Sequence, residues 1–295
     1  MLFQGLATAL ITPFKRDKSV DFDAYARLLE YQIENGVNAL LVLGTTGEPP
    51  TLSDAEKEEV IKFAVEKIGG RVPVLVGAGS NCTASMVEAY RRGAKYGANA
   101  LLVVTPYYNK CTQEGLIEHY RAACEASDLP VIAYNVPGRT GVNIKPETAA
   151  RMAEKLPRLV GLKEACGNMA QILETARLID GSNMTLYSGD DGLALPIFAA
   201  GGKGLISVAS NPAPALTGEL VRACLDGNFD RARALQFRLQ PFFDALFCEV
   251  NPIPAKKACA LMGICEDEVR LPLTRMSEGN AEKLAGIMRS LGLIA

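Results

Sequence analysis

The chain has 295 residues, 48% of them hydrophobic and 22% charged, which is a globular composition with enough apolar residues for a large core. A formal net charge of -2 gives no general attraction to nucleic acid or to acidic membrane, and no run approaches the about 18 apolar residues of a membrane span. Eight cysteines without a C-x-x-C pair, and a start without a basic region, predict a reduced, cytoplasmic protein.

Strand-like and helix-like segments alternate from the first residues onward. We expect eight short apolar strands, at residues 5–11, 39–43, 72–76, 100–104, 131–135, 159–163, 184–187 and 204–207. Helices are expected between most of them, for example at residues 21–35, 53–68, 83–96, 112–127 and 146–156. Eight such units in series predict a (β/α)8 barrel, an α/β fold, over residues 1–226, because an open doubly wound sheet rarely needs so many.

The pattern changes after residue 226. Residues 229–247, 254–262 and 278–291 have helical spacing, and no strand is expected among them. They predict a C-terminal helical domain over residues 227–295. These helices carry large apolar side chains such as Phe237 and Phe243. We therefore expect them to pack on the barrel or on another subunit.

The most informative stretch is residues 159–164, because an apolar run there ends in Lys163. A lysine at the end of a buried strand either reaches water or loses its proton, since apolar surroundings disfavour the charged amine and lower its pKa. Such an amine is a nucleophile that attacks carbonyl groups. The alternative is a strand-end lysine that is paired with Glu164 or another carboxylate.

In a (β/α)8 barrel the chemistry gathers where strands end and the next loops begin. The second strand is followed by Gly44-Thr45-Thr46-Gly47-Glu48, whose hydroxyl and N–H groups suit an anionic carboxylate. Tyr134 ends the fifth strand, and Arg139 follows a rigid Pro-Gly turn, a position that suits a two-bond grip on a carboxylate. A plain surface arginine is the alternative for Arg139.

Other polar residues receive structural interpretations. Asp190 and Asp191 open a predicted helix, where capping is a simpler role than magnesium binding. The single histidine, His119, is expected on a helix surface, and one histidine cannot build a histidine-rich zinc site. We therefore expect no metal and no cofactor. The remaining set of one lysine, one arginine, hydroxyls and phenols predicts Schiff-base chemistry on a small keto acid.

Several motifs, taken in order, resemble those of the 4-hydroxy-tetrahydrodipicolinate synthase (dihydrodipicolinate synthase) family. They cover essentially the whole chain: Gly44-Thr45-Thr46-Gly47-Glu48, Tyr107-Tyr108-Asn109, Tyr134-Asn135-Val136-Pro137-Gly138-Arg139-Thr140, Gly161-Leu162-Lys163-Glu164, Ser188-Gly189-Asp190-Asp191 and Asn251-Pro252-Ile253-Pro254. The resemblance implies a lyase of the class I aldolase type. Such an enzyme condenses pyruvate with L-aspartate 4-semialdehyde to 4-hydroxy-tetrahydrodipicolinate in lysine and diaminopimelate biosynthesis.

The resemblance also implies a role for individual residues. These are Lys163 as the Schiff-base lysine; Tyr134, Thr46 and Tyr108 as the proton relay; Thr45, Thr46, Gly189 and Ile206 around pyruvate; and Arg139 on the semialdehyde carboxylate. Tyr108 is expected to reach the active site of a neighbouring subunit. The expected assembly is therefore a homotetramer built as a dimer of dimers.

Related barrels remain as alternatives. Sialic-acid lyases share the lysine and the tyrosine, but they usually have serine where Thr45 stands and generally lack the Gly138-Arg139-Thr140 turn. An aldolase or dehydratase acting on a sugar acid, and a barrel that only binds a metabolite, are the other two alternatives. Compared with relatives that L-lysine inhibits, this chain has Lys57 and Ser85 at two effector positions, so we expect weak or absent inhibition.

Overall fold

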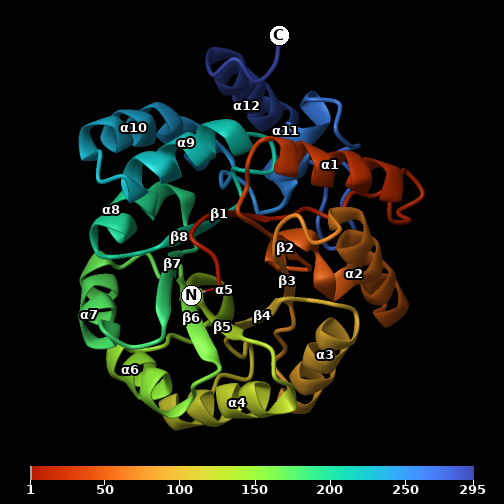
Figure 1. Ribbon diagram of the computed structural model, residues 1–295. Helices are drawn as coiled ribbons and strands as arrows, with labels where there is room; N and C mark the ends of the chain where they lie inside the picture. Colours follow the sequence, from red (N-terminus) through yellow and green to blue (C-terminus); the bar gives the residue numbers. More distant parts are fainter. Residues whose placement is uncertain (1) are drawn as a thin grey trace.

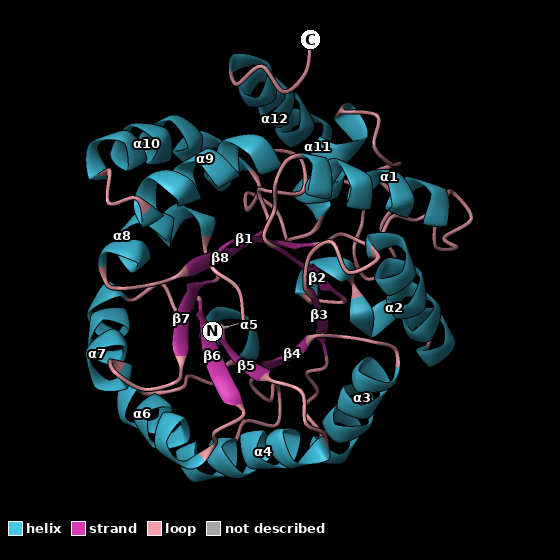
Figure 2. Ribbon diagram, in the orientation of Figure 1, coloured by secondary structure: helices cyan, strands magenta, loops and turns pink. Residues whose placement is uncertain are grey.

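The computed structural model describes residues 2–295, and its centre is a closed barrel of eight parallel strands (Figures 1 and 2). Each strand pairs with the next, and β8 pairs with β1 to close the sheet. The strands are β1 (Gly5–Ala9), β2 (Ala39–Val42), β3 (Val74–Gly77), β4 (Ala100–Val104), β5 (Val131–Asn135), β6 (Leu159–Glu164), β7 (Thr185–Ser188) and β8 (Gly204–Ser207). The predicted barrel is confirmed.

Eight helices cover the outside of the barrel and appear as a ring in Figure 1. They are α1 (Phe22–Glu34), α2 (Asp54–Ile68), α3 (Thr83–Lys95), α4 (Gln113–Ala126), α6 (Pro146–Lys155), α7 (Met169–Ile179), α8 (Ala194–Ala199) and α9 (Pro214–Leu225). Four shorter turns of helix lie in the loops after strands: η1 (Thr45–Gly47), η2 (Pro49–Thr51), α5 (Pro137–Thr140) and η3 (Asp191–Leu193). The predicted bounds of strands and helices differ from the observed ones by at most two residues.

The helix α2 illustrates why these bounds could be read from the sequence. The Ser53 side chain accepts from the backbone N–H of Glu56, and the Glu56 side chain accepts from the N–H of Ser53, so the two residues form a capping box. Gly69 ends the helix in the left-handed conformation that glycine favours. The buried side chains Val60, Ile61, Ala64 and Ile68 lie on one face of the helix and pack against the barrel.

Alternation along the strands separates two hydrophobic cores. One set of side chains fills the inside of the barrel: Ala7, Leu41, Leu75, Leu102, Ile132, Tyr134, Tyr187 and Ile206. Their neighbours along the same strands point outward and pack under the helices, as Leu40 and Leu162 do. In β6 the alternation that turns Leu162 outward turns Lys163 inward, toward the axis of the barrel.

Three further helices follow the barrel: α10 (Phe229–Ala245), α11 (Ile253–Leu261) and α12 (Glu278–Ser290). In Figure 1 they lie together at the top, where α10 runs beside α9 and α12 lies nearest the C-terminus. The C-terminal helices are thus present as expected. The division into domains at residues 226 and 227 stays a prediction, because α10 packs directly on α8 and α9 of the ring.

One prediction about α4 is wrong, because His119 is not on the helix surface. It is 4% exposed, its Nδ1 lies 2.9 Å from the Thr83 hydroxyl, and burial lowers its pKa to about 4. A neutral imidazole packs in the space between α3 and α4 as a mostly apolar ring, which the polar pattern of α4 does not reveal.

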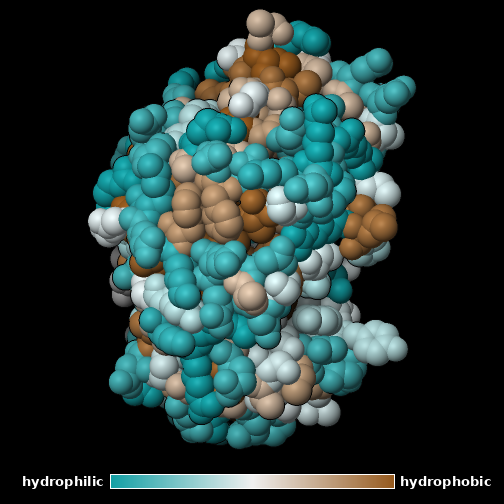
Figure 3. Space-filling view, turned by 90° about the vertical axis from the view of Figure 1, so that its right-hand side faces the viewer, coloured by the Kyte–Doolittle hydropathy of each residue, from teal (hydrophilic) through white to brown (hydrophobic). Residues whose placement is uncertain are grey.

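Two observations describe the outer surface. Figure 3 shows the face on the right of Figure 1, where α1, α2 and α3 lie, as largely hydrophilic around an apolar patch. Within residues 2–295, no helix has both the length and the apolar composition needed to cross a membrane.

Candidate active site

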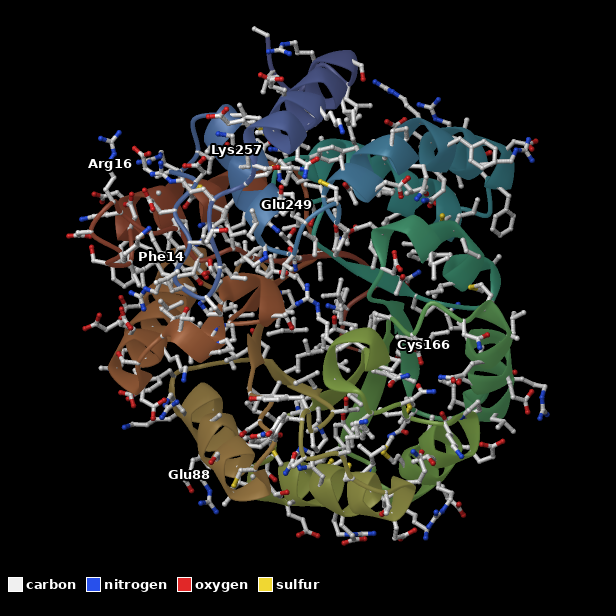
Figure 4. All side chains as sticks on the ribbon, turned by 180° about the vertical axis from the view of Figure 1, so that it is seen from behind. Phe14, Arg16, Glu88, Cys166, Glu249 and Lys257 are labelled. Carbon is white, nitrogen blue, oxygen red and sulfur yellow. The ribbon has the colours of Figure 1, made fainter. Side chains whose placement is uncertain are left out.

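The centre of the candidate site is a pair of buried side chains on neighbouring strands. Lys163 in β6 and Tyr134 in β5 are partners in the parallel register, and they are 4% and 7% exposed. The Lys163 Nζ atom lies 4.1 Å from the centroid of the Tyr134 ring. Both residues are at the ends of their strands, at the edge of the barrel where Cys166 is labelled in Figure 4.

Burial makes the Lys163 amine easier to deprotonate. It lowers the pKa of Lys163 from 10.5 to about 8; the positive charge of Arg139 acts in the same direction, while Asp191 and Asp190 oppose the shift. At neutral pH the neutral fraction is therefore far larger than that of a free lysine, by about tenfold for each unit of pKa. The barrel therefore holds an amine that loses its proton more readily than a free lysine does.

The alternative of a Lys163–Glu164 ion pair is ruled out by the strand geometry. Glu164 points outward, where its carboxylate accepts from Asn135 Nδ2 at 3.0 Å and from the Cys166 backbone N–H at 2.8 Å. None of the lysine ion pairs among residues 2–295 includes Lys163.

Tyr134 keeps its proton at neutral pH. Burial raises the pKa of Tyr134 to about 12, although the nearby positive charge of Arg139 opposes the shift. The phenol next to the amine is therefore a hydrogen-bond donor and a weak acid, suited to giving a proton to an oxygen that leaves the reacting carbon.

Thr45 and Thr46 form the short helix η1 after β2, as the sequence predicted for a polar loop at this position. Thr46 is 2% exposed, and its Oγ1 accepts a hydrogen bond from Asn251 Nδ2 at 3.0 Å. A second hydrogen bond holds the same loop, because the Thr12 hydroxyl donates to the backbone carbonyl of Gly47 at 2.8 Å.

The loop ends at Glu48, whose side chain pairs with a lysine of α11. Glu48 has a φ of 54°, in the left-handed region, and its carboxylate lies 2.5 Å from Lys256 Nζ in α11. Both side chains are almost fully buried, and Lys256 also donates to the Glu268 backbone carbonyl at 2.7 Å. The Lys256 Nζ stands 3.8 Å from the ring centroid of Phe14, which Figure 4 labels. We call this ion pair the Glu48–Lys256 joint.

Arg139 lies in α5, the short helix that follows β5. It is exposed, and its Nη2 donates to the backbone carbonyl of Asn251 at 3.3 Å. The end of α5 is fixed by Thr140, which accepts from the Thr105 hydroxyl at 3.0 Å. An exposed guanidinium with most of its donors unused can still bind an incoming carboxylate.

Gly189 and Ile206 lie beside the lysine and the tyrosine respectively. A Cβ atom added to Gly189 would stand 2.8 Å from Lys163 Cε, so the lysine side chain occupies the space that glycine leaves. Ile206 is buried in the same inner core as Tyr134. Larger side chains at position 189 would push the amine out of place.

The two aspartates after β7 have structural partners. Asp190 caps η3 by accepting from the Gly192 N–H at 2.9 Å, as predicted. Asp191 does more than cap: its buried carboxylate accepts from the Ser207 hydroxyl at 2.5 Å and from the Val208 N–H at 3.0 Å. No cluster of potential metal ligands is found in the described residues.

A cavity of about 1300 Å³ opens next to this site. Tyr134, Arg139, Thr45 and Asn251 line its inner part, and it continues outward to Lys57, Ser85 and Tyr107 between α2 and α3. Tyr134 belongs to this lining, and the Lys163 Nζ atom lies 4.1 Å from the centroid of its ring, so the amine is next to the cavity.

Tyr108 is not brought into the site of its own chain. It follows β4, has a φ of 71°, and is 90% exposed. An aromatic side chain this exposed has little packing in the single chain. Its role in a site stays a prediction.

Sequence reasoning gave no role to Asn251 or to Lys256, although the first of them belongs to a quoted motif. Asn251 contacts both Thr46 and Arg139, and Lys256 holds the loop that carries Thr46. The run Asn251-Pro252-Ile253-Pro254, polar at one position between two helices, was the available signal.

Comparison with known proteins places this arrangement among relatives of one kind. The model of the Dihydrodipicolinate synthetase family matches residues 2–291. The 4-hydroxy-tetrahydrodipicolinate synthase of Alkaliphilus oremlandii is 49% identical over 99% of this chain and 100% of its own. The crystal structure of dihydrodipicolinate synthase from Thermotoga maritima superposes with a TM-score of 0.98 at 47% identity, covering 100% of both chains. The chloride-inhibited enzyme of Acinetobacter baumannii, complexed with pyruvate, gives 0.95 at 41% identity over 99% of both chains.

Proposed function

This chain belongs to the dihydrodipicolinate synthetase family, and on that premise we propose that it condenses pyruvate with L-aspartate 4-semialdehyde through an imine on Lys163. The product of the reaction is 4-hydroxy-tetrahydrodipicolinate, an intermediate of lysine and diaminopimelate biosynthesis. The observation that carries the proposal is the buried Lys163 amine, which has no carboxylate partner among the described residues and faces the Tyr134 ring at 4.1 Å.

The chemistry begins with attack of the neutral Lys163 amine on the keto carbon of pyruvate. The carbinolamine loses its hydroxyl as water, to which a protonated phenol such as Tyr134 supplies a proton, and an imine remains. Loss of a proton from the pyruvate methyl group gives an enamine, whose carbon attacks the aldehyde of the second substrate. The amino group of that substrate then displaces Lys163 and closes the ring.

Each substrate carboxylate has a place in this scheme. The backbone N–H groups and hydroxyls of the Thr45–Gly47 turn hold the pyruvate carboxylate, while Gly189 makes space for the Lys163 side chain and Ile206 packs in the same inner core as Tyr134. Arg139, exposed at the wall of the cavity, binds the carboxylate of the semialdehyde. Thr46 and Tyr134 are members of the proton relay.

Tyr108 is the third member of the relay and acts in the site of a partner subunit. Its 90% exposure and its strained backbone support this role, because a protruding aromatic side chain gains packing when a second copy covers it. The assembly is then a dimer of dimers. The eight free cysteines support a reduced setting, consistent with the cytoplasm.

Borohydride trapping with pyruvate, followed by peptide mass mapping, tests the central step. The expected result is a reduced pyruvyl adduct on Lys163. Folded protein that yields no adduct at this residue would remove the imine and the proposed reaction with it. If the adduct forms, untreated enzyme is then assayed with pyruvate and several aldehydes. This assay separates the semialdehyde reaction from condensation with a sugar-derived aldehyde.

The shared site has its own test. Tyr108→Phe and Lys163→Ala variants are each expected to be slow, and refolding them together should restore part of the activity in hybrid oligomers. Mixtures that stay as slow as the two separate variants would show that Tyr108 does not complete a partner's site.

A further inference from the structure

We propose that Asn251, on the segment between α10 and α11, is a positioning residue that sets both Thr46 and Arg139 for the reaction. Its Nδ2 donates to Thr46 Oγ1 at 3.0 Å, and its backbone carbonyl accepts from Arg139 Nη2 at 3.3 Å. Asn251 lies outside the barrel sequence but is 5% exposed and lines the cavity. The inference deepens the proposed function and rests on it.

The side-chain contact fixes what the Thr46 hydroxyl has left to offer. A hydroxyl carries one proton and two lone pairs. Asn251 occupies one lone pair, so one lone pair and the proton remain. These are the two groups that a link in a proton relay needs, because it must accept from one neighbour and donate to the next. Without the amide, the buried hydroxyl is free to turn its proton away from the site.

The oxygen of the same side-chain amide makes no hydrogen bond in the described part of the chain, although this Asn251 Oδ1 atom is buried. A residue that served only to close the contact between the barrel and the C-terminal helices would be expected to have both ends of its amide satisfied. Among the described residues the Asn251 side chain is therefore oriented by its Nδ2 bond to Thr46, which points to a role at that hydroxyl.

The position of Asn251 is held by the Glu48–Lys256 joint. Glu48 follows Thr46 by two residues, and Lys256 lies in the helix α11 that begins just after Asn251. The buried ion pair therefore ties together the two short segments that carry the donor and the acceptor. The Glu48–Lys256 joint thus keeps Asn251 close to Thr46, although neither of these two residues takes part in the ion pair.

A double-mutant cycle on kcat tests the role. Asn251→Ala should lower kcat by roughly 10-fold to 100-fold, and the Asn251→Ala/Thr46→Val double variant should be no slower than Thr46→Val alone. Asn251→Asp replaces the donor by an acceptor at constant shape and should lose about as much. Because the backbone carbonyl stays in both, the KM for the semialdehyde should change by less than about threefold. If Asn251→Ala does not fold, the same double-mutant cycle is measured with Asn251→Asp in its place.

Asn183→Ala is the matched control. Asn183 Nδ2 donates to the Pro157 backbone carbonyl at 2.8 Å, an amide contact just before β7 and β6 and so at the opposite end of the barrel from the site, and kcat should not change. Losses that multiply in the double variant, or a kcat for Asn251→Ala within about twofold of the unmutated enzyme, would overturn the proposal. No adduct on Lys163 in the unmutated enzyme would instead overturn the proposed function.

Discussion

Two lysines of this protein are almost fully buried, and they are held in opposite ways. Lys256 lies 2.5 Å from the Glu48 carboxylate and donates to a backbone carbonyl, whereas Lys163 has no carboxylate within ion-pair distance among residues 2–295. Each amine stands close to an aromatic ring, at 3.8 Å from Phe14 and 4.1 Å from Tyr134. Both pKa values are lowered by burial, but Glu48 opposes the shift at Lys256.

The difference teaches which property decides the role of a buried amine. An aromatic ring is common to both sites, so the ring does not make the nucleophile. An adjacent carboxylate keeps the charge and fixes the structure, while distant carboxylates leave the amine able to lose its proton. Substituting each lysine should therefore affect the two sites differently: the change at Lys256 should mainly alter the stability of the fold, and the change at Lys163 should mainly alter turnover.

The largest expected effect is on turnover, from Lys163→Met. Activity should fall by at least about 10³-fold, because the proposed imine forms on this amine. Stability should rise at the same time by roughly 1–3 kcal/mol, since a buried cation is removed. Denaturant unfolding and steady-state kinetics measure the two effects, with Lys203→Met at an exposed position as the control.

The sign of the stability change depends on pH. The pKa of Lys163 falls from 10.5 in the unfolded chain to about 8 in the folded protein. Between these values the unfolded chain holds more protons, so the stability of the unmutated protein rises with pH. The gain from Lys163→Met should be complete below pH 8 and absent above about 10.5. A gain that does not change with pH would contradict the buried, depressed amine.

The next effect is on stability, from Lys256→Met. Leaving the Glu48 carboxylate buried without its partner should cost about 3–5 kcal/mol in the free energy of unfolding. Lys257→Met is the matched control, because Lys257 pairs with Asp267 at 3.0 Å on a more open surface and should cost less than about 1 kcal/mol. Equal losses in the two variants, measured by denaturant unfolding, would remove the contrast.

A smaller, tenfold effect is expected in the pH dependence of imine formation. The rate of pyruvate trapping should rise about tenfold per pH unit below pH 8 and level off above it, because the proposed nucleophile is the neutral form of the Lys163 amine. Arg139→Ala removes a positive charge that lowers the pKa of Lys163, so the inflection should move to higher pH. An inflection that stays in place would mean that Arg139 does not act on the amine.

The smallest effect is expected from added L-lysine. A third lysine, Lys57, lines the outer cavity beside Ser85 and pairs with Asp54 at 3.2 Å. Its charge disfavours a cationic effector there, so L-lysine should lower turnover by less than about twofold. Strong inhibition at sub-millimolar L-lysine, measured in the coupled assay with both substrates, would refute this expectation.

The sequence predicted what depends on neighbours along the chain. Apolar strands, helix caps and the positions of Lys163 and Tyr134 at strand ends follow from patterns a few residues long. The contact between Asn251 and Thr46 joins residues 205 positions apart, and the Glu48–Lys256 joint spans a similar separation. No local pattern shows which distant residues will be in contact, and a lone buried lysine in α11 reads as an ordinary surface charge.

The ring of Tyr134 has one more consequence, for the chemical safety of the site. An amine with a pKa of about 8 is reactive toward many electrophiles of the cell, including reducing sugars and activated acyl groups. Lys163 is 4% exposed, and its amine lies 4.1 Å from the centroid of the Tyr134 ring. The packing that lowers the pKa thus also leaves the amine little surface that a dissolved electrophile can reach.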